Sequence, residues 1–509
     1  MRIGLVIPAS NFLIDDRCFI YLGVIQLGTF ARTLGHEVEV VDLTGHPRVC
    51  TKSHHDDACA ESTLSEAKRR VADLAARSDV VGCYSMAALH FFVSRLLPAI
   101  REGNPSCVAV LGGPHASTAP ERCAAEGWDY VVVSDQGGGG GEPGFAEVLK
   151  RVGRRSEAPR LGRLPMLTNS AGIGACESVS LMTRSGPVVL GPDAANAIIR
   201  VPSRDPGAGL YQNDRFPWPD RSLVDFESYR YTIGEHRFAS FVDQAGCVFR
   251  CSFCAHSEGY TKMALRSPAH VEAEIRAVLA RYPYINAFMN YADEINIRTD
   301  FDEMLGTYKK LHREMGIVWR GFFKSGRRWM TDDLFARMAD AGIRYLCTGA
   351  ESAHPAVLKL VGKGATVEDN TAFVRLCVKH GIKPKVFTMV GLPAESPESV
   401  EALATWLEAM AADGLSDADT TICTPTSGTP LFEESEKWLK TGLISFDKAE
   451  LVSNNESVNY KGAVGQYKSF VSTPTLSRAA LVRARAMVER RFRKAAGLAP
   501  LGVSGKDDG

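Results

Sequence analysis

The sequence has neither a net charge nor a long apolar run. Its 59 Lys and Arg residues balance 59 Asp and Glu residues over 509 positions, so no overall field favours nucleic acid or an anionic membrane as a partner. No stretch of about 18 apolar residues occurs, and we expect no membrane span. The start, Met1 to Pro8, has the pattern of a short strand and lacks the cleavage site of a signal peptide. The basic cluster from Arg483 to Lys494 is expected to be a solvated helix face.

The paired cysteines of a disulfide framework are also missing. Three of the 13 cysteines lie close together and the others are scattered singly, which fits a reducing compartment and predicts a cytoplasmic protein. The composition, 45% apolar and 23% charged, is that of a soluble globular protein. A chain of this length exceeds one ordinary core. We expect a first domain at 1–153, a linker or insertion at 154–235, a second domain at 236–432, and a helical C-terminal domain with a tail at 433–509.

The first domain alternates strands with helices. Strands are expected at 2–7, 37–42, 79–84, 107–112 and 129–133, and helices at 22–34, 61–77, 90–101 and 144–152. This alternation, with buried β-branched strands, predicts right-handed crossovers and a doubly wound parallel sheet of the Rossmann-like α/β class. Such sheets bind ligands at the carboxyl ends of their strands. Small, polar and glycine-rich loops follow four of the expected strands and favour a large ligand there: they contain Ser10, Leu13, Ser85, Met86, Gly112, Gly113, Pro114, His115, Gly141 and Glu142.

The linker is irregular and rich in Pro, Gly and Arg. Residues 181–183 and 188–190 have the pattern of a small hairpin. Residues 216–220 contain two prolines and are expected to run extended, because proline denies helix on both sides.

Cys247, Cys251 and Cys254 stand in a C-x3-C-x2-C spacing just after a strand-like run. Iron–sulfur clusters are held by cysteine thiolates, and three ligands on a [4Fe–4S] cube leave one iron open for a substrate or cofactor. The alternative is a structural zinc site with His256 as a fourth ligand, although such sites usually draw on two pairs of ligands.

This spacing, with Phe253 before the last cysteine, resembles the radical S-adenosylmethionine (SAM) superfamily. The second domain alternates again, with strands expected at 239–242, 287–291, 318–323, 345–349, 385–390 and 419–424 and helices at 269–281, 299–315, 331–341, 367–379 and 396–412. Six such units imply the partial (β/α)6 barrel of that superfamily, with its chemistry at the carboxyl ends of the strands.

The resemblance assigns further residues to SAM. Asp293 or Glu294 follows the second strand, where the superfamily contacts the methionine amino group, and a carboxylate suits an ammonium. The third strand supplies Arg320 and Lys324, and one of them, Lys324 in the first place, would steady the SAM carboxylate. Glu351 and Ser352 match a Gly-x-Glu-Ser motif facing the ribose or methionine. Gly391 opens a Gly-Leu-Pro turn that packs against adenosine.

The first domain resembles the cobalamin-binding domain that precedes many radical SAM domains. The supporting residues are Leu22-Gly23, the run from Gly35 to Asp42, and the run from Gly112 to Ser117. Two features depart from the wider pattern of cobalamin proteins. The Asp-x-His-x-x-Gly signature that supplies a cobalt-ligating His is absent, so cobalamin is expected to bind without one. The glycine run 137–141 replaces a compact Gly-Glu-Gly-Glu turn and is either a cobalamin contact or a flexible insertion.

The resemblance implies a [4Fe–4S] cluster, SAM and cobalamin, with a flavodoxin or ferredoxin as electron donor. The leading expectation is a methyltransferase: an adenosyl radical takes a hydrogen from an unactivated carbon, which then receives methyl from methylcobalamin. The expected substrate is a small natural-product intermediate, and a peptide substrate stays open as an alternative. Two alternatives stay open, because fold does not fix function: another cobalamin-linked rearrangement, cyclisation or oxidation resembling the oxidative cyclases, and a non-catalytic cobalamin sensor.

Overall fold

The computed structural model describes residues 1–9, 16–45, 57–133, 141–157, 179–183, 186–190, 198–200, 211–212, 214, 217–255, 263–453 and 467–500. The chain forms two compact units. The first comprises Met1–Asn11, Tyr21–Arg204 and Pro217–Phe226, and the second Phe12–Ile20, Asp205–Phe216 and Glu227–Gly509. Among the described helices, none combines the length and the apolar composition that crossing a membrane requires.

The first unit is built on a parallel sheet in the order β2-β1-β3-β4-β5-β8. Five strands confirm the predicted doubly wound sheet, and the sixth comes from the segment expected to be a linker. Their bounds are β1 Arg2–Ile7, β2 Glu37–Asp42, β3 Val80–Tyr84, β4 Val108–Gly112, β5 Tyr130–Val133 and β8 Ile198–Arg200.

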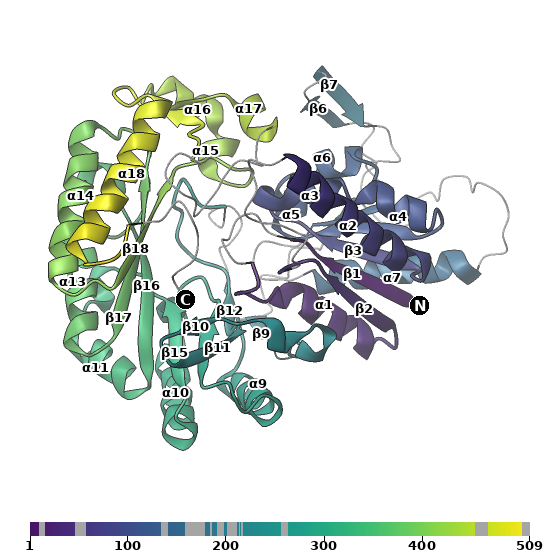
Figure 1. Ribbon diagram of the computed structural model, residues 1–509, viewed down its shortest axis with the longest axis horizontal. Coiled ribbons are helices and arrows are strands. Elements are labelled where there is room, and N and C mark those ends of the chain that lie inside the picture. The colour runs from purple at the N-terminus through teal and green to yellow at the C-terminus, as the bar shows by residue number, and fades with distance from the viewer. Residues whose placement is uncertain are drawn as a thin grey trace. The chain divides into compact units, whose positions relative to one another are not determined.

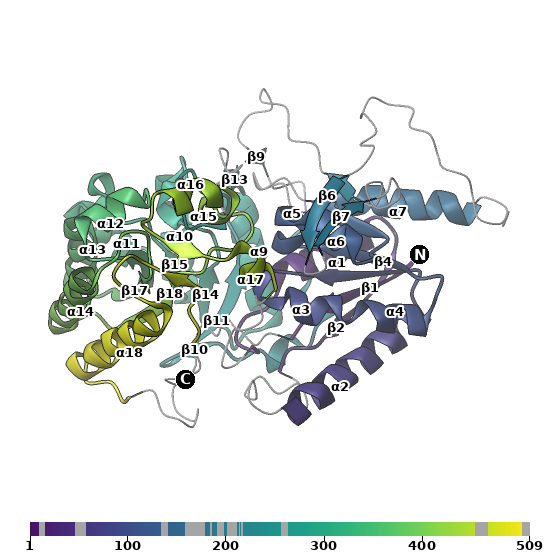
Figure 2. The same cartoon turned by 90° about the horizontal axis from the view of Figure 1, so that it is seen from above.

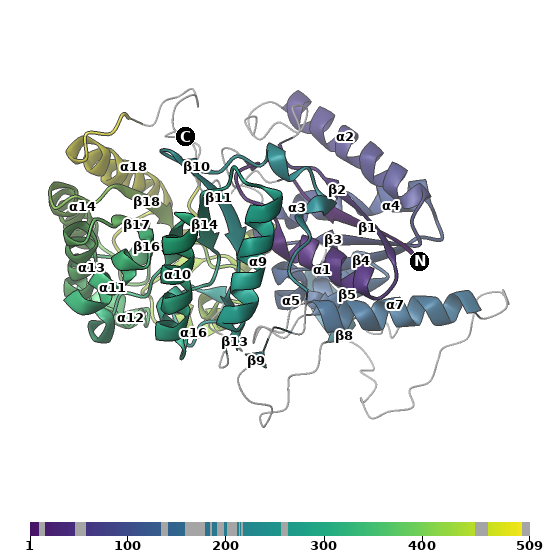
Figure 3. The same ribbon diagram turned by 90° about the horizontal axis from the view of Figure 1, so that it is seen from below.

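Helices cover both faces of this sheet (Figures 2 and 3). One face packs against α1 (Leu22–Thr33) and α7 (Glu142–Glu157), and the other against α2 (Asp57–Ala76), α3 (His90–Ser94) and α4 (Leu97–Gly103). We predicted one helix over 90–101, which is wrong. Pro98 stands in the first turn of α4, and because proline has no N–H it starts a helix better than it continues one.

The hairpin predicted in the linker is present as β6 (Val179–Thr183) and β7 (Gly186–Leu190). The described part of the extended segment packs on α1. The Gln26 amide donates a hydrogen bond to the Pro217 carbonyl at 2.5 Å, and the backbone N–H of Asp220 donates to Thr29 Oγ1 at 2.8 Å. These bonds tie 217–226 to the first unit.

The second unit contains the predicted partial barrel. Its sheet runs β10-β11-β14-β15-β16-β17-β18, with six consecutive parallel strands and a short antiparallel β10 (Thr232–Ile233) that we did not predict. The parallel strands are β11 His236–Phe241, β14 Ala287–Asn290, β15 Val318–Phe322, β16 Ile343–Glu351, β17 Lys383–Val390 and β18 Asp417–Ile422. The predicted helices appear as α9 Pro268–Arg281, α10 Phe301–Met315, α11 Asp332–Asp340, α13 Val367–Lys379 and α14 Pro397–Ala412.

The last helix, α18 (Arg478–Ala495), lies beside α14 and against β18 (Figure 1). The expectation that its basic residues form only a solvated face is wrong for Arg485, which is 2% exposed and donates to the Thr420 carbonyl at 3.0 Å. Arg491 pairs with Glu401 at 2.6 Å and with Glu408 at 2.5 Å. Part of this basic cluster therefore fastens the C-terminal region to the barrel.

Candidate functional site

The three clustered cysteines lie on one loop that begins at Gly246, after β11 and the short β12 (Gln244–Ala245). Gly246 has φ 97° and donates its N–H to Asp293 Oδ2 at 3.0 Å. Ser252 connects the loop to two later segments: its N–H donates to the Val361 carbonyl, and its carbonyl accepts from Leu431, both at 2.9 Å. Phe253 packs among Val357, Val361, Leu392, Cys423 and Leu431. The loop is thus held by segments that follow three different strands.

The three sulfur atoms do not converge on one point. Within the part of the chain that the structure describes, Cys247, Cys251 and Cys254 are not among the groups whose ligand atoms lie within 4.8 Å of one another. A mononuclear zinc ion needs such convergence, whereas an iron–sulfur cube places each cysteine on a separate iron. The described residues therefore show no preformed mononuclear zinc site at this loop, and His256, the fourth ligand of the zinc alternative, lies outside them.

Burial affects the chemistry of two of these thiols. It raises the pKa of Cys247 to about 11 and also raises that of Cys251, where the nearby charges of Lys363 and Lys324 act in the opposite direction. Thiolates are the form that binds metal, so the two lysines favour the ligating form of Cys251.

A buried charged cluster stands beside Cys251. Lys363 Nζ pairs with Glu351 Oε1 at 2.9 Å, and each side chain is 8% exposed. Lys324 donates to the backbone carbonyl of Lys363 and places its Nζ 4.5 Å from the centre of the Phe249 ring. Burial and the charge of Lys363 lower the pKa of Lys324 to about 8. An anion bound here would stabilise the charged form of Lys324, as expected for a group that holds a carboxylate.

The backbone at Gly349 and Glu351 has the conformation and the space that the Lys363–Glu351 ion pair requires. Glu351 has φ 59°, a left-handed conformation that a non-glycine residue adopts at a cost. A Cβ on Gly349 would lie 2.2 Å from Glu351 Oε1 and 2.7 Å from Lys363 Nζ. Glycine at 349 therefore leaves the space that the ion pair fills. Ser352, 1% exposed, follows directly and accepts from the His354 N–H through Oγ at 3.1 Å.

One carboxylate oxygen of Glu294 accepts no hydrogen bond from the described residues and could accept one from an ammonium group. Burial raises its pKa to about 7, Asp293 and Glu351 add to the rise, and Lys363 and Lys324 oppose it. Its Oε2 is buried and has no hydrogen-bond partner among the described residues. Asp293, in contrast, is engaged with the cysteine loop. A contact of either carboxylate with the methionine amino group stays a prediction.

The Gly391 turn is held by a buried carboxylate that the sequence did not reveal. Gly391 has φ 85° and donates its N–H to Glu395 Oε2. Glu395 is 1% exposed, and its backbone carbonyl accepts from Thr473 Oγ1 at 2.7 Å. Burial raises the pKa of Glu395 to about 8, so the carboxyl is largely protonated at neutral pH.

This raised pKa predicts that the stability of the folded protein depends on pH. The substitution Glu395→Gln should remove that dependence. Because the folded-state pKa lies above the ordinary 4.5, the native protein keeps a proton that the unfolded chain loses. The stabilisation is complete below about pH 4.5 and is lost as pH rises to about 8. We expect the melting temperature of the wild type to fall relative to that of Glu395→Gln between pH 5 and pH 8.5, measured as a difference in matched buffers. A difference that does not change with pH would contradict the assignment.

The described residues that were predicted to contact cobalamin lie in the first unit. Ser85 and Met86 follow β3, the Gly112–His115 loop follows β4, and Gly141 and Glu142 open α7. Ser10, Leu13 and residues 137–140 of the glycine run lie outside the described residues. Ser85 ties two of these loops together, since its N–H donates to the Gly112 carbonyl at 2.8 Å and its carbonyl accepts from the His115 N–H at 3.1 Å. Parallel pairing thus brings the β3 and β4 loops to one edge, as predicted.

Two positions in these loops have specific geometry. Gly113 has φ 100°, and a Cβ there would lie 2.5 Å from the Ser85 carbonyl oxygen, so only glycine fits. The ring of His115 is 1% exposed and points into the unit. A cobalamin contact from His115 stays a prediction, and its backbone is the part that would make it.

Comparison with known proteins agrees with this site. Residues 241–407, which include all three clustered cysteines, match the family model of the radical SAM superfamily. The chain therefore has a radical SAM domain, which implies a [4Fe–4S] cluster and SAM.

Curated relatives match over most of the chain. The anaerobic magnesium-protoporphyrin IX monomethyl ester cyclase of Rubrivivax gelatinosus is 26% identical over 393 residues, covering 77% of this chain and 64% of the relative. An uncharacterized methyltransferase of Pyrococcus horikoshii is 25% identical over 364 residues, covering 70% and 69%. The match thus spans slightly less than two thirds of the cyclase.

Solved structures share the fold of this chain. The radical SAM methyltransferase TsrM from Kitasatospora setae, solved with tryptophan and a SAM analogue, superposes with a TM-score of 0.58 at 20% identity, covering 86% of this chain and 76% of TsrM. The cobalamin-dependent radical SAM enzyme OxsB superposes at 0.55 and 14% identity, covering 98% and 62%. The predicted resemblance is confirmed at the level of fold, which is that of cobalamin-dependent radical SAM enzymes.

Proposed function

We propose that this protein is a cobalamin-dependent radical SAM methyltransferase that acts on an unactivated carbon of a small natural-product intermediate. The observation that carries the proposal is the juxtaposition of the cysteine loop with a buried set of two lysines and two glutamates, one of which has an unpaired oxygen. Two cations and two acids beside an iron–sulfur motif suit the carboxylate and ammonium of SAM. The methyltransferase TsrM shares the fold, and a methyltransferase is among the curated relatives.

The chain's own residues would divide the work as follows. Cys247, Cys251 and Cys254 hold three irons and leave the fourth for SAM. Glu294 accepts hydrogen bonds from the amino group, and Lys324 binds the carboxylate. Lys363 pairs with Glu351 at 2.9 Å and holds that side chain in place in the buried site.

When bound, the cluster and SAM supply an adenosyl radical, and methylcobalamin, expected in the first unit, supplies the methyl group. The remaining contribution of the protein is position and the exclusion of water. A flavodoxin or ferredoxin is the expected electron donor.

Oxidative cyclisation is the second candidate, because two of the matched relatives are anaerobic magnesium-protoporphyrin IX monomethyl ester cyclases. Both candidates use the same radical-generating site, so the two reactions differ in the fate of SAM. A methyltransferase of this kind consumes SAM in two ways, as radical source and as methyl donor.

The test is a product balance. Anaerobically reconstituted protein, loaded with cobalamin, is incubated with reductant, host-cell extract and SAM carrying a deuterated methyl group. We expect 5′-deoxyadenosine and S-adenosylhomocysteine together, and a product heavier by one labelled methyl group. Deoxyadenosine without S-adenosylhomocysteine and without a methylated product would overturn methyl transfer and favour the cyclase reaction.

Cobalamin binding is tested separately by EPR after desalting and reduction to cob(II)alamin. We expect a retained base-off signal without nitrogen coupling at cobalt, because the His-ligand signature is absent. A +1 cluster signal perturbed by SAM should accompany it. Loss of cobalamin on desalting, with the cluster signal intact, would leave a radical SAM enzyme without the means of methyl transfer.

A further inference from the structure

We propose that His90, His115 and Cys123 form a second metal site, which binds one zinc ion or a similar borderline transition-metal ion. The site lies in the first unit and is independent of the cysteine loop and of the proposed function. One ligand atom from each of the three residues lies within 4.8 Å of the other two. All three side chains are buried, with exposures of 3%, 1% and 0%.

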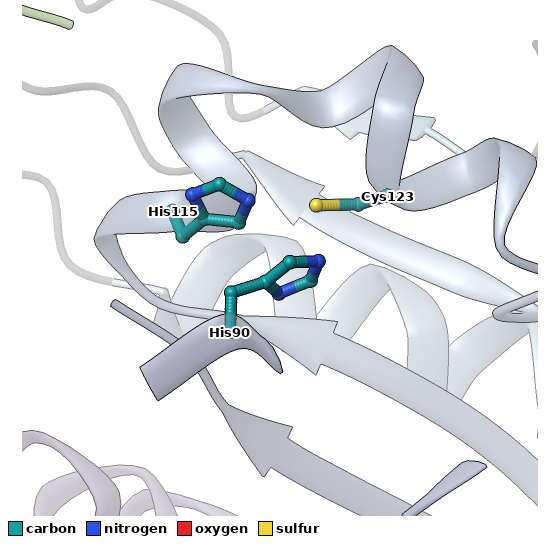
Figure 4. Close-up of side chains that lie close together, drawn as sticks. All are labelled: His90, His115 and Cys123. Atoms are coloured by element: carbon teal, nitrogen blue, oxygen red, sulfur yellow. The ribbon is translucent and has the colours of Figure 1, made fainter. Parts of the chain in front are cut away.

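The three residues come from separate elements that meet at one edge of the sheet. His90 begins α3, His115 lies in α5 (Pro114–Thr118), and Cys123 lies in α6 (Pro120–Ala125). The sulfur of Cys123 is directed toward the His115 ring, and the His90 ring lies across from both (Figure 4). The two imidazole rings are 4.0 Å apart between centroids.

His115 is the observation that points to a ligand. Neither ring nitrogen has a hydrogen-bond partner among the described residues, although both are buried. Buried polar side-chain atoms nearly always have a partner, and each exception needs an explanation. A neutral imidazole offers one nitrogen lone pair, and here that ring stands beside a second imidazole and a thiol.

Both ring nitrogens of His90 have partners, and one of these contacts would open for coordination. Its Nδ1 forms a 2.9 Å hydrogen bond with Ser85 Oγ, and its Nε2 lies 2.8 Å from Glu126 Oε1. A hydrogen bond to one ring nitrogen is the usual device that fixes a metal-binding histidine and presents the other nitrogen. An ion at Nε2 would replace the contact with Glu126 and take that carboxylate as its fourth ligand.

The donor set suits zinc in chemistry and in charge. Two imidazoles, one thiolate and one carboxylate are typical zinc ligands, and four of them make a closed tetrahedral site. Zn–N bonds of about 2.0–2.1 Å and Zn–S bonds of about 2.3 Å put the donor atoms about 3.3–3.7 Å apart. The ligand atoms of His90, His115 and Cys123, already within 4.8 Å of one another, would reach that spacing by side-chain shifts of about 1 Å. A divalent ion with two anionic ligands is electrically neutral, as burial requires.

The site would stiffen the edge predicted to contact cobalamin. Ser85 bonds to His90 through its hydroxyl and to the Gly112–His115 loop through its backbone. An ion bridging α3, α5 and α6 would therefore fix both loops. Its role is structural, and it would need no open coordination position.

The test removes the other metal-binding residues first. Full-length protein with Cys247, Cys251 and Cys254 all replaced by alanine is produced with added zinc, desalted and analysed for metal. We expect about one zinc per chain, and a thiolate-to-cobalt charge-transfer band after exchange with Co²⁺. Adding Cys123→Ser or His115→Ala should lower the retained metal at least about tenfold, whereas Cys107→Ser, at a buried cysteine before β4, should retain it.

If a site variant fails to fold, the ligands are identified instead by X-ray absorption spectroscopy of the metal-loaded protein that carries only the three alanine replacements. One sulfur and three nitrogen or oxygen neighbours are expected around the ion. Absence of retained metal, a shell without sulfur, or retention unchanged by Cys123→Ser and His115→Ala would overturn the proposal.

Discussion

Cys251→Ala is expected to abolish reductant-dependent cleavage of SAM. Cys251 is buried at 8% exposure, and its loop is anchored on both sides through Ser252. With only two cysteine ligands left, the protein should not hold the cluster. After reconstitution it should show neither the visible absorbance of the cluster nor 5′-deoxyadenosine. The measurements are iron and sulfide content, absorbance, and chromatography of the SAM products.

The matched control is Cys377→Ala. Cys377 is fully buried on α13, so the substitution removes a buried thiol of the same unit without touching the loop. We expect normal cluster content and normal SAM cleavage from it. Full cluster content in Cys251→Ala, or an equal loss in both variants, would contradict the assignment of the loop as the cluster ligand.

Lys363→Met is expected to be strongly destabilising. The substitution keeps much of the side-chain volume but leaves Glu351, buried beside Glu294, without its 2.9 Å cation. Removing one partner of a buried ion pair costs about 3–5 kcal/mol, which for a unit of this size corresponds to a fall in melting temperature of roughly 5–15 °C. Thermal unfolding of the apo-protein, followed by tryptophan fluorescence, is the measurement.

Two further variants test whether the loss of stability comes from the buried ion pair. Lys309→Met makes the same change at an exposed pair with Asp340 and should cost about 1 kcal/mol or less. The double variant Lys363→Met/Glu351→Gln removes both charges and should recover at least half of the stability lost in the single variant, because no unpaired ion remains at 351. If the double variant loses as much stability as Lys363→Met and Glu351→Gln lose when added together, the two residues are not coupled.

Several parts of this protein follow from local sequence. The cluster cysteines lie within eight consecutive positions, so their spacing alone carries the chemistry. The strands and helices follow from apolar periodicity, and most begin and end within a few residues of the predicted bounds. The prediction of one helix over 90–101 was wrong because the apolar pattern is continuous there, although Pro98 marks the start of a separate helix.

The partners of the site residues depend on tertiary structure. Lys363 was missed because its contacts, Glu351 and Lys324, are 12 and 39 residues away in the chain and meet only where neighbouring parallel strands end. In the sequence, Val361-Gly362-Lys363-Gly364 has the pattern of a loop after a helix, and its glycines were the one available signal.

Burial is the second property that sequence could not supply. Glu395 follows a Gly-Leu-Pro turn and has the pattern of a surface acid. Thr473, 78 positions later, donates to its backbone carbonyl, and burial in the folded chain raises the pKa of its carboxyl. His115 was predicted as a ligand contact from its loop, and the packing of α3 and α6 directs its ring inward against His90 and Cys123.

The sequence by itself therefore determined the α/β class of both sheets, the cysteine motif and the sheet edges at which function is proposed. Tertiary structure alone decided which charged groups are paired, which are buried, and where a second metal ion would fit. The physical reason is that periodicity and spacing are properties of neighbours in the chain, whereas the pKa of a carboxyl or the convergence of ligands depends on groups that only the folded chain brings within a few ångströms.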